Sequence, residues 1–153
     1  MLRSWIAGGL ICALLGACSG ERPAHLGVRG GQLAPCPDRP NCVSSFAGDP
    51  EHYVAPLLFS APAPEVMRRV KAALKKMDRV TLVEEKPNYI YAEFTSRVFR
   101  FVDDVEFYLD EKTGTLHFRS ASRLGYSDLG VNRERIETIK RLLEATDRFP
   151  STT

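Results

Sequence analysis

The sequence predicts a single α+β domain in which an antiparallel sheet of about five strands carries two helices on one face. Apolar residues repeat at helical spacing over residues 64–77. Within residues 80–119, separate short stretches alternate apolar and polar side chains, as half-buried strands do, and a second helical pattern covers residues 133–146. With one strand before the first helix, the order is β-α-β-β-β-β-α, which a single sheet covered on one face satisfies.

The first two elements lie between residues 53 and 77. Residues 53–60 are rich in apolar side chains and form the first predicted strand. Pro64 suits the first turn of a helix, and apolar residues from Val66 to Met77 recur every three or four positions with Lys and Arg between them. This pattern predicts an amphipathic helix with a solvated basic face. The alternative, that the basic face binds a membrane or phosphate, stays open.

The middle of the chain predicts a run of strands. Residues 80–85 are rich in β-branched side chains and are followed by a turn at residues 86–88. Residues 96–101 break the alternation and indicate a bulge, a bend or an extension. Alternation over residues 89–95 places side chains on two faces: Ile90, Ala92 and Phe94 inward, and Tyr89, Tyr91, Glu93 and Thr95 outward.

The next two strands can be paired residue by residue. Residues 111–114 form a four-residue hairpin loop, which sets Asp110 opposite Thr115. Both faces of the hairpin are then chemically matched, as a correct register requires. The predicted pairs are Leu109 with Leu116, Phe107 with Phe118, Tyr108 with His117, and Glu106 with Arg119.

The last element is a helix over about residues 133–146. Asn132 is a suitable N-cap, and Val131 and Ile136 have the spacing of a hydrophobic staple. Ile136, Ile139, Leu142 and Leu143 form its buried stripe, and residues 148–153 are a frayed tail. This element order is similar to that of the TATA-binding-protein-like fold, although a fold order does not carry a function.

The N-terminus has the layout of a secretory signal. Arg3 precedes an apolar run over residues 5–15, which is too short to cross a bilayer core of ~30 Å. Leu15-Gly16-Ala17-Cys18 resembles the bacterial lipobox, which implies a signal peptide of residues 1–17 and a diacylglyceryl thioether, commonly with a third acyl chain such as palmitate, on Cys18. An ordinary cleaved signal and an uncleaved anchor are the alternatives.

The lipobox resemblance also implies a location. Two acyl chains hold a protein stably on a membrane, and Ser19 after the cysteine favours the outer over the inner membrane of the cell envelope, facing the periplasm. Residues 18–34 contain several Gly and Pro and little periodicity, so they are expected to be a flexible tether. The domain then covers residues 35–147.

The composition and the cysteines bear on which partners and cofactors the protein is expected to bind. The chain has 21 Lys and Arg against 19 Asp and Glu, and loss of Arg3 leaves 20 against 19, which gives no support for a nucleic-acid partner. Cys12 leaves with the signal, so Cys36 and Cys42 most simply form a disulfide in an oxidising compartment. A metal site of these two cysteines with His52 matches no zinc spacing, and no cofactor is predicted.

Three blocks of sequence carry a family resemblance: residues 40–45, residues 91–107 and residues 119–133. Pro40-Asn41-Cys42-Val43-Ser44-Ser45 opens the first block. The blocks, in this order, resemble the DUF1499 family over roughly residues 33–143. The resemblance implies a small single domain, often attached to a lipoprotein signal or a membrane segment. It transfers no catalytic residue, since the family has no established function.

The loop before the last helix is the first candidate site. It carries Arg119, Arg123, Tyr126, Asp128 and Arg133. Arginines near a helix N-terminus could seat an anion or a carboxylate. The alternative is structural: the arginines pair with the aspartates of residues 103, 104 or 128, and the polar side chains cap the helix.

The outward face of the sheet is the second candidate. It carries Tyr91, Glu93, Glu106, Tyr108, His117 and Arg119. If no helix covers it, this face is either solvated or a ligand surface. His117 could act as a general base with Glu93 or Glu106, although the chain has no G-x-S-x-G, H-E-x-x-H or nucleotide fingerprint.

Three functions remain from the sequence. The first is a non-catalytic envelope lipoprotein that binds an envelope protein or a small anionic ligand. The second is a structural or assembly lipoprotein without a ligand. The third is an unrecognised hydrolase that uses His117 with Glu93 or Glu106.

Overall fold

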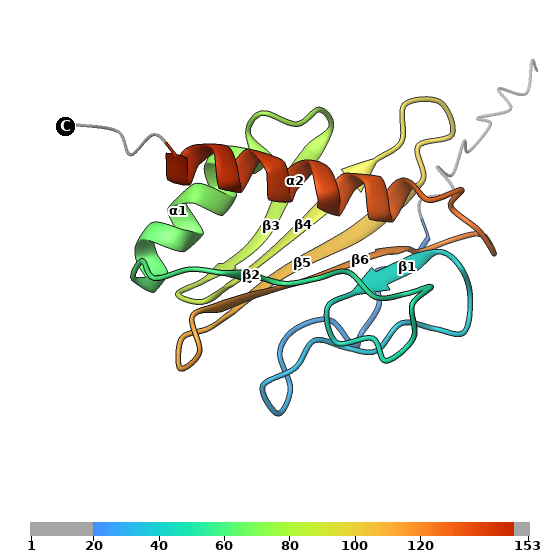
Figure 1. Ribbon diagram of the computed structural model, residues 1–153. Coiled ribbons are helices and arrows are strands. Elements are labelled where there is room, and N and C mark those ends of the chain that lie inside the picture. The colour runs from blue at the N-terminus through green and yellow to red at the C-terminus, as the bar shows by residue number, and fades with distance from the viewer. Residues whose placement is uncertain (1–19, 149–153) are drawn as a thin grey trace, which may run out of the picture.

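In the computed structural model, which describes residues 20–148, two helices lie side by side on one face of a six-stranded antiparallel sheet (Figure 1). The strand order is β1-β6-β5-β4-β3, and β2 pairs with β6 on the same side as β1. The elements are β1 (Cys42–Ser44), β2 (Leu57–Leu58), α1 (Ala63–Leu74), β3 (Val80–Lys86), β4 (Tyr89–Thr95), β5 (Val102–Asp110), β6 (Thr115–Ser122) and α2 (Val131–Arg148).

The predicted α+β class is confirmed, with its antiparallel sheet and both helices on one face. The predicted hairpin register is also confirmed. Asp110 pairs with Thr115, Phe107 with Phe118, Tyr108 with His117, and Glu106 with Arg119. Since one residue of slip would exchange the two faces, this register fixes which side chains face the helices.

The N-terminal strands differ from the prediction. The strand expected over residues 53–60 is reduced to β2, because Pro56 has no N–H to donate to a ladder. Just beyond β2, the Phe59 N–H bonds to the Gly114 carbonyl at 2.8 Å. Strand β1 lies in the Pro-rich stretch around Cys42 and pairs with the second half of β6. Three residues are too few to show a strand period, so β1 was not predicted from the sequence.

The start of α2 is also corrected. The helix begins at Val131, and the carboxylate of Asp128 caps it by accepting the N–H groups of Gly130 at 2.9 Å and Asn132 at 2.8 Å. Asn132, the predicted N-cap, is instead inside the helix and fully buried. Val131 is 47% exposed and does not join the core, so the predicted staple with Ile136 is wrong.

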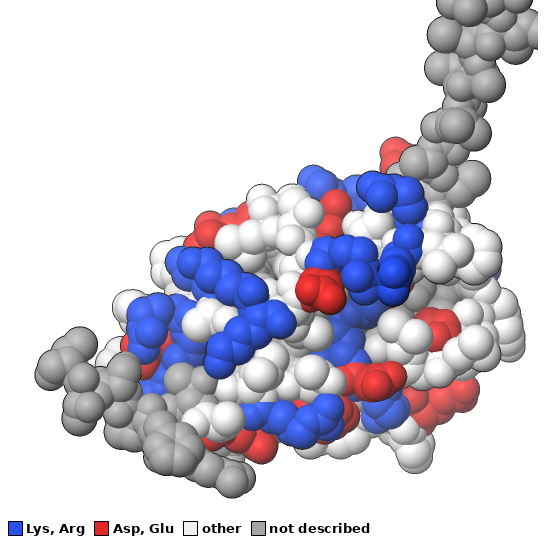
Figure 2. All heavy atoms as spheres, turned by 90° about the horizontal axis from the view of Figure 1, so that it is seen from above, with Lys and Arg blue, Asp and Glu red and all other residues white. Residues whose placement is uncertain are grey.

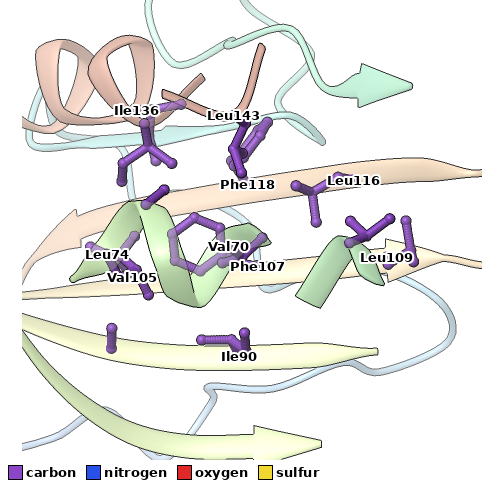
Figure 3. Packing of buried hydrophobic residues seen from close by; sticks show 14 of the residues in the cluster. Val70, Leu74, Ile90, Val105, Phe107, Leu109, Leu116, Phe118, Ile136 and Leu143 are labelled. Carbon is purple, nitrogen blue, oxygen red and sulfur yellow. The ribbon is translucent and has the colours of Figure 1, made fainter. Parts of the chain in front are cut away.

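The main core lies between the helices and the sheet (Figure 3). Val70 and Leu74 from α1, and Ile136 and Leu143 from α2, point at the inward side chains of the central strands. The rings of Phe107 and Phe118 meet edge to face with centroids 6.0 Å apart. Full burial of side chains of this size, at about 1.5–3 kcal/mol each, makes this layer the main source of stability.

The other face of the sheet is covered by the N-terminal segment, residues 20–41, which lies on the side away from the helices (Figure 1). Leu33 is buried there against Tyr89 and Tyr91. The Gly27 N–H bonds to a carboxylate oxygen of Glu106 at 2.7 Å. Residues 20–34 therefore differ from the tether expected over residues 18–34, and the outward sheet face is not open. Cys18 lies outside the described residues.

The helix-covered face carries many cations, with Asp and Glu among them (Figure 2). On α1, Arg68 and Arg69 both bind Glu65, and Lys71 binds Glu85 at 2.8 Å. These pairs fit the solvated basic face that the sequence predicts. Within residues 20–148, no helix has the length and apolar character needed to span a bilayer.

If the N-terminal segment is part of the folded unit, Leu33→Ala should lower the free energy of unfolding by about 2–4 kcal/mol, because a buried leucine loses its contacts and leaves a cavity. Val28→Ala, in the same segment but exposed, is the matched control. Urea unfolding measures both. Equal midpoints for the two variants would show that the segment does not fold with the domain.

Candidate functional site

The candidate site is the outward face of β4, β5 and β6 together with the N-terminal segment that covers it. Alternation along the strands brings their polar side chains to this face, as predicted. The face divides into two buried clusters of charge. We call them the Arg123 cluster and the Glu106 cluster, after the residue at the centre of each.

Arg123 stands at the centre of the first cluster, just after β6. Its Nε lies 3.0 Å from Oδ2 of Asp104, and its Nη2 lies 2.7 Å from Oδ1 of the same carboxylate. Nη2 also bonds to Glu93 and to the hydroxyl of Tyr91. Arg22, from the N-terminal segment, reaches the same Glu93 oxygen at 2.7 Å. The cluster therefore joins β4, β5, the end of β6 and the covering segment.

Hydrogen bonding sets the protonation states in this cluster. Burial alone would raise the pKa of Glu93, but the bonds from the two arginines and Tyr91 hold that pKa below its ordinary value. Burial, and then the bond to Asp104, raises the pKa of Tyr91 well above 10. Bonding to Asp104 raises the pKa of Arg123. At neutral pH Glu93 is therefore an ionised carboxylate, Arg123 a cationic guanidinium and Tyr91 a neutral phenol.

Glu106 stands at the centre of the second cluster and is fully buried. One of its oxygens accepts the Gly27 N–H at 2.7 Å and the Tyr89 hydroxyl at 2.9 Å. The other oxygen receives a long bond of 3.4 Å from Nη1 of Arg119. Burial lowers the pKa of Arg119 against the opposing effect of Glu106, so this guanidinium is less well compensated than that of Arg123.

A cavity of about 450 Å³ opens between β6 and the N-terminal segment. Apolar atoms of the Pro- and Ala-containing stretch 34–37, including Cys36, form part of its wall. Its polar lining comprises His25, Arg39, Asn41, Asp104, Arg119, Ser122 and Arg123. A volume in this range is typical of small-molecule sites.

Two buried polar atoms of residues that line the cavity have no hydrogen-bond partner among the described residues. They are Nε of Arg119 and Oδ1 of Asn41, in residues that are 2% and 3% exposed. The Asn41 side chain is held in place by its Nδ2, which donates to the Gly125 carbonyl at 2.8 Å. An unpaired buried polar group costs about 1–3 kcal/mol, so a donor and an acceptor left unpaired beside one cavity call for an explanation.

The predicted disulfide between Cys36 and Cys42 is confirmed, with its Cα atoms 5.6 Å apart. It ties the cavity wall to β1, and neither sulfur is left as a thiolate that could bind a metal. His52 bonds to Asp49 and to the carbonyl of Arg39. Within residues 20–148, no three His, Cys, Asp or Glu side chains gather in a way that could hold a metal ion.

His117 lies apart from the two carboxylates that the hydrolase interpretation assigned to it. Its Nδ1 is 3.1 Å from Oγ of Ser45, and its ring stacks with the rings of Phe46 and Tyr108, at centroid distances of 4.1 Å and 6.0 Å. Oγ of Ser45 also accepts the Phe118 N–H at 2.9 Å, so this serine continues the backbone ladder. Burial lowers the pKa of His117. Among the described residues, no carboxylate is hydrogen-bonded to this imidazole.

The remaining candidate residues of the loop before α2 are dispersed. Tyr126 is exposed, and Asp128 caps α2 as described above. Arg133 donates to the carbonyls of Glu51 and Tyr53 at 2.7 Å each and so secures the segment before β2. These residues do not converge on one point, which gives Asp128 and Arg133 the structural role that the sequence left open.

A further buried polar network lies on the helix side and was not predicted. The amide of Asn132 bonds to Ser120, Ser122 and the Asn41 carbonyl. Arg135 joins the network and forms an ion pair with Asp103. No sequence period marks these residues, because they are spread over β5, β6, α2 and the stretch before β1. The network fixes α2 to the end of the sheet that also carries the cavity.

Sequence reasoning missed Arg22, Arg39 and Asn41 as members of the site. Asn41 stands inside the Pro40-Asn41-Cys42 block that carries the family resemblance, which was the one available signal. The two arginines lie in stretches without periodicity. The sequence therefore gave no indication that they would meet the sheet.

Comparison with known proteins supports a family assignment. The model of a family described as "Protein of unknown function (DUF1499)" matches residues 32–143. No curated protein matches the chain. Since the family match covers most of the sequence, the chain belongs to the DUF1499 family.

The Arg123 cluster predicts a large loss of stability on truncation. Arg123→Ala should lower the free energy of unfolding by about 3–5 kcal/mol, because it leaves the buried Asp104 without its cation. Arg97→Ala, at an exposed arginine, should change it by no more than about 0.5 kcal/mol. Thermal and urea unfolding measure both. If the two variants were equally stable, Arg123 would be free for ligand binding rather than engaged in the fold.

Proposed function

We propose that this DUF1499 protein is an envelope lipoprotein, held on a membrane by acyl chains on Cys18, whose domain binds a small anionic ligand in the cavity beside Arg119. The proposal includes the outer membrane as its location, with the domain facing the periplasm. An envelope protein that delivers or receives the ligand is a further candidate partner.

One observation carries the ligand-binding part: the cavity wall holds an unpaired donor and an unpaired acceptor. Nε–H of Arg119 and Oδ1 of Asn41 are both buried without a partner. A ligand with an anionic group and an O–H or N–H donor would complement the two residues. A carboxylate or a phosphate satisfies the first requirement, since guanidinium groups recognise both.

The charges around the cavity also favour an anion. Three arginines line it, against one aspartate. Arg123 is largely neutralised by Asp104 and Glu93, whereas the guanidinium of Arg119 has, within residues 20–148, only the long bond to Glu106. Arg39 stands exposed. The negative charge of an anion in the cavity would offset the effect of burial, which lowers the pKa of Arg119.

Binding is a better account of this geometry than catalysis. The carboxylates of the face are tied up in bonds to arginines, tyrosines and a backbone N–H, and His117 lies with Ser45 instead. A second candidate function, an assembly role without a ligand, is favoured by the complete pairing of Arg123. The two candidate functions differ at Arg119, which binds the ligand in the first and has no ligand in the second.

The anchor is tested by Cys18→Ala. This substitution should block lipidation and signal processing and release or mislocalise the protein, because the acyl chains on Cys18 are what would hold the processed chain on the membrane. Fractionation together with intact mass of the mature chain measures both effects. A Cys18→Ala protein that stays in the membrane fraction at the mature size would contradict the lipoprotein assignment.

The cavity is tested with two anions, hexanoate and inorganic phosphate, and with 1-hexanol as the neutral counterpart of hexanoate. A ligand that binds the folded state raises the melting temperature with concentration. We expect this effect from at least one anion and not from hexanol. Arg119→Lys should remove it, because lysine keeps the positive charge facing Glu106 but lacks Nε–H.

The melting temperature of the unliganded Arg119→Lys protein serves as the control and should not fall below that of the natural chain by more than a few degrees. Stabilisation that persists in Arg119→Lys, or the lack of stabilisation by either anion, would favour the assembly role over ligand binding.

A further inference from the structure

Exposed apolar side chains gather at one end of the domain. Seven of the eleven large apolar side chains that stand exposed within residues 20–148 belong to the β4–β5 loop, the β6–α2 loop or the first residue of α2. In the first loop, Val98 and Phe99 are 75% and 71% exposed, and in the second Leu129 is 94% exposed. Exposed apolar groups gathered in one place mark an interaction surface rather than an ordinary solvated one.

The two loops are neighbours in space although they are far apart in sequence. Thr95 and Val102, which flank the β4–β5 loop, are paired across the sheet. The Arg123 N–H, at the start of the β6–α2 loop, donates to the Val102 carbonyl at 3.1 Å. Both loops therefore leave the sheet at the same end, on the right in Figure 1. We call this end the loop end.

The described chain begins at the loop end. A Cβ on Gly20 would lie 2.9 Å from Cβ of Arg123 and 3.1 Å from Cγ of Leu124, so Gly20 is packed against the start of the β6–α2 loop. Two residues later, Arg22 is bound to Glu93 of β4. The first residues of the domain are thus fixed in place next to the exposed side chains.

The distance from Gly20 to the proposed lipid is short. Cys18 precedes Gly20 by two residues, and two extended residues reach no more than about 7 Å. Acyl chains on Cys18 lie in the bilayer, so the membrane surface must pass close to Gly20. An anchor this short brings the loop end to the membrane and leaves little room for a protein between them.

From these observations we propose that the loop end lies in the interfacial region of the bilayer, with the side chains of Val98, Phe99, Leu124 and Leu129 among the lipids. This inference rests on the proposed lipidation of Cys18. The domain then stands on the membrane with its strands pointing toward it, and the Leu58 end of the sheet points into the periplasm.

The composition of the loop end fits a lipid surface. Phe99 and Phe101 stack with centroids 5.5 Å apart, and Arg97 and Arg100 alternate with these apolar residues. Seen from the helix side, Lys and Arg side chains stand at the end where the described chain begins (Figure 2). Arginine near aromatic side chains suits an anionic bilayer, because the apolar groups enter the interface while the cations meet the headgroups.

The test uses tryptophan as a reporter of depth. The sequence has a single tryptophan, Trp5, which leaves with the signal peptide, so Phe99→Trp introduces a unique reporter at the loop end. Leu58→Trp is the matched control, because Leu58 is 77% exposed at the opposite end of β6, where it pairs with Thr115. Both variants are expressed as the full chain, purified in the processed form and reconstituted in vesicles of phosphatidylethanolamine and phosphatidylglycerol.

We expect the emission of the Phe99→Trp protein to shift to shorter wavelength in vesicles and to be quenched several-fold more by brominated lipid than that of the Leu58→Trp protein. Equal quenching of the two would overturn the proposal. A shift that arises without vesicles and grows with protein concentration would also overturn it, because the loop end would then contact a second copy.

Intact mass separates this proposal from the lipoprotein assignment. If the processed chain carries lipid and Phe99→Trp is not quenched, the anchor stands and the docking of the loop end is wrong. If the chain carries no lipid, the anchor is wrong, and the same variants mixed with vesicles decide the docking. Selective quenching of Phe99→Trp would support docking, and its absence would overturn it.

Discussion

The ion pair between Arg123 and Asp104 holds together the outward face of the sheet. Both side chains are almost fully buried, and such a pair is tolerated only when its remaining donors and acceptors are bonded. Tyr91 and Glu93 supply those bonds, and Arg22 then binds Glu93 from outside the sheet. The N-terminal segment is therefore required to complete the charge balance of the strands. A charged face of this kind favours one arrangement of the N-terminal segment, because any other arrangement leaves charges unpaired.

The sheet is thus buried on both faces, by the two helices on one face and by the irregular N-terminal segment on the other. The helices cover the apolar side through periodic packing. An irregular segment covers the charged side, and it is fixed by specific bonds such as that between the Gly27 N–H and Glu106. Irregular segments lose much conformational entropy on ordering. The Cys36–Cys42 disulfide restricts the end of this segment where it joins β1.

The cavity lies where the N-terminal segment pairs the charges of the Glu106 cluster less fully than those of the Arg123 cluster. Arg22 extends the bonding of the Arg123 cluster, whereas among the described residues nothing bonds to Nε of Arg119, which lines the cavity together with residues 34–37. The proposed ligand site therefore lies where the N-terminal segment leaves polar atoms beside the sheet without hydrogen-bond partners among the described residues. Its lining reaches residues 121–123 at the end of β6, so the cavity lies toward the loop end, near the membrane to which the chain is proposed to be anchored.

The sequence by itself determined the layer of helices on the sheet and the hairpin register. A period of two or of three to four residues reports which side of a local element is buried, and the pairs Phe107–Phe118 and Glu106–Arg119 follow from counting across a four-residue loop. Tertiary structure alone decided what covers the charged face and where a cavity is left. The contacts responsible, Arg22 with Glu93 and Gly27 with Glu106, join residues 71 and 79 positions apart. They involve an irregular segment with no repeat, so no local pattern encodes them, and they form only once the strands have brought their charges together.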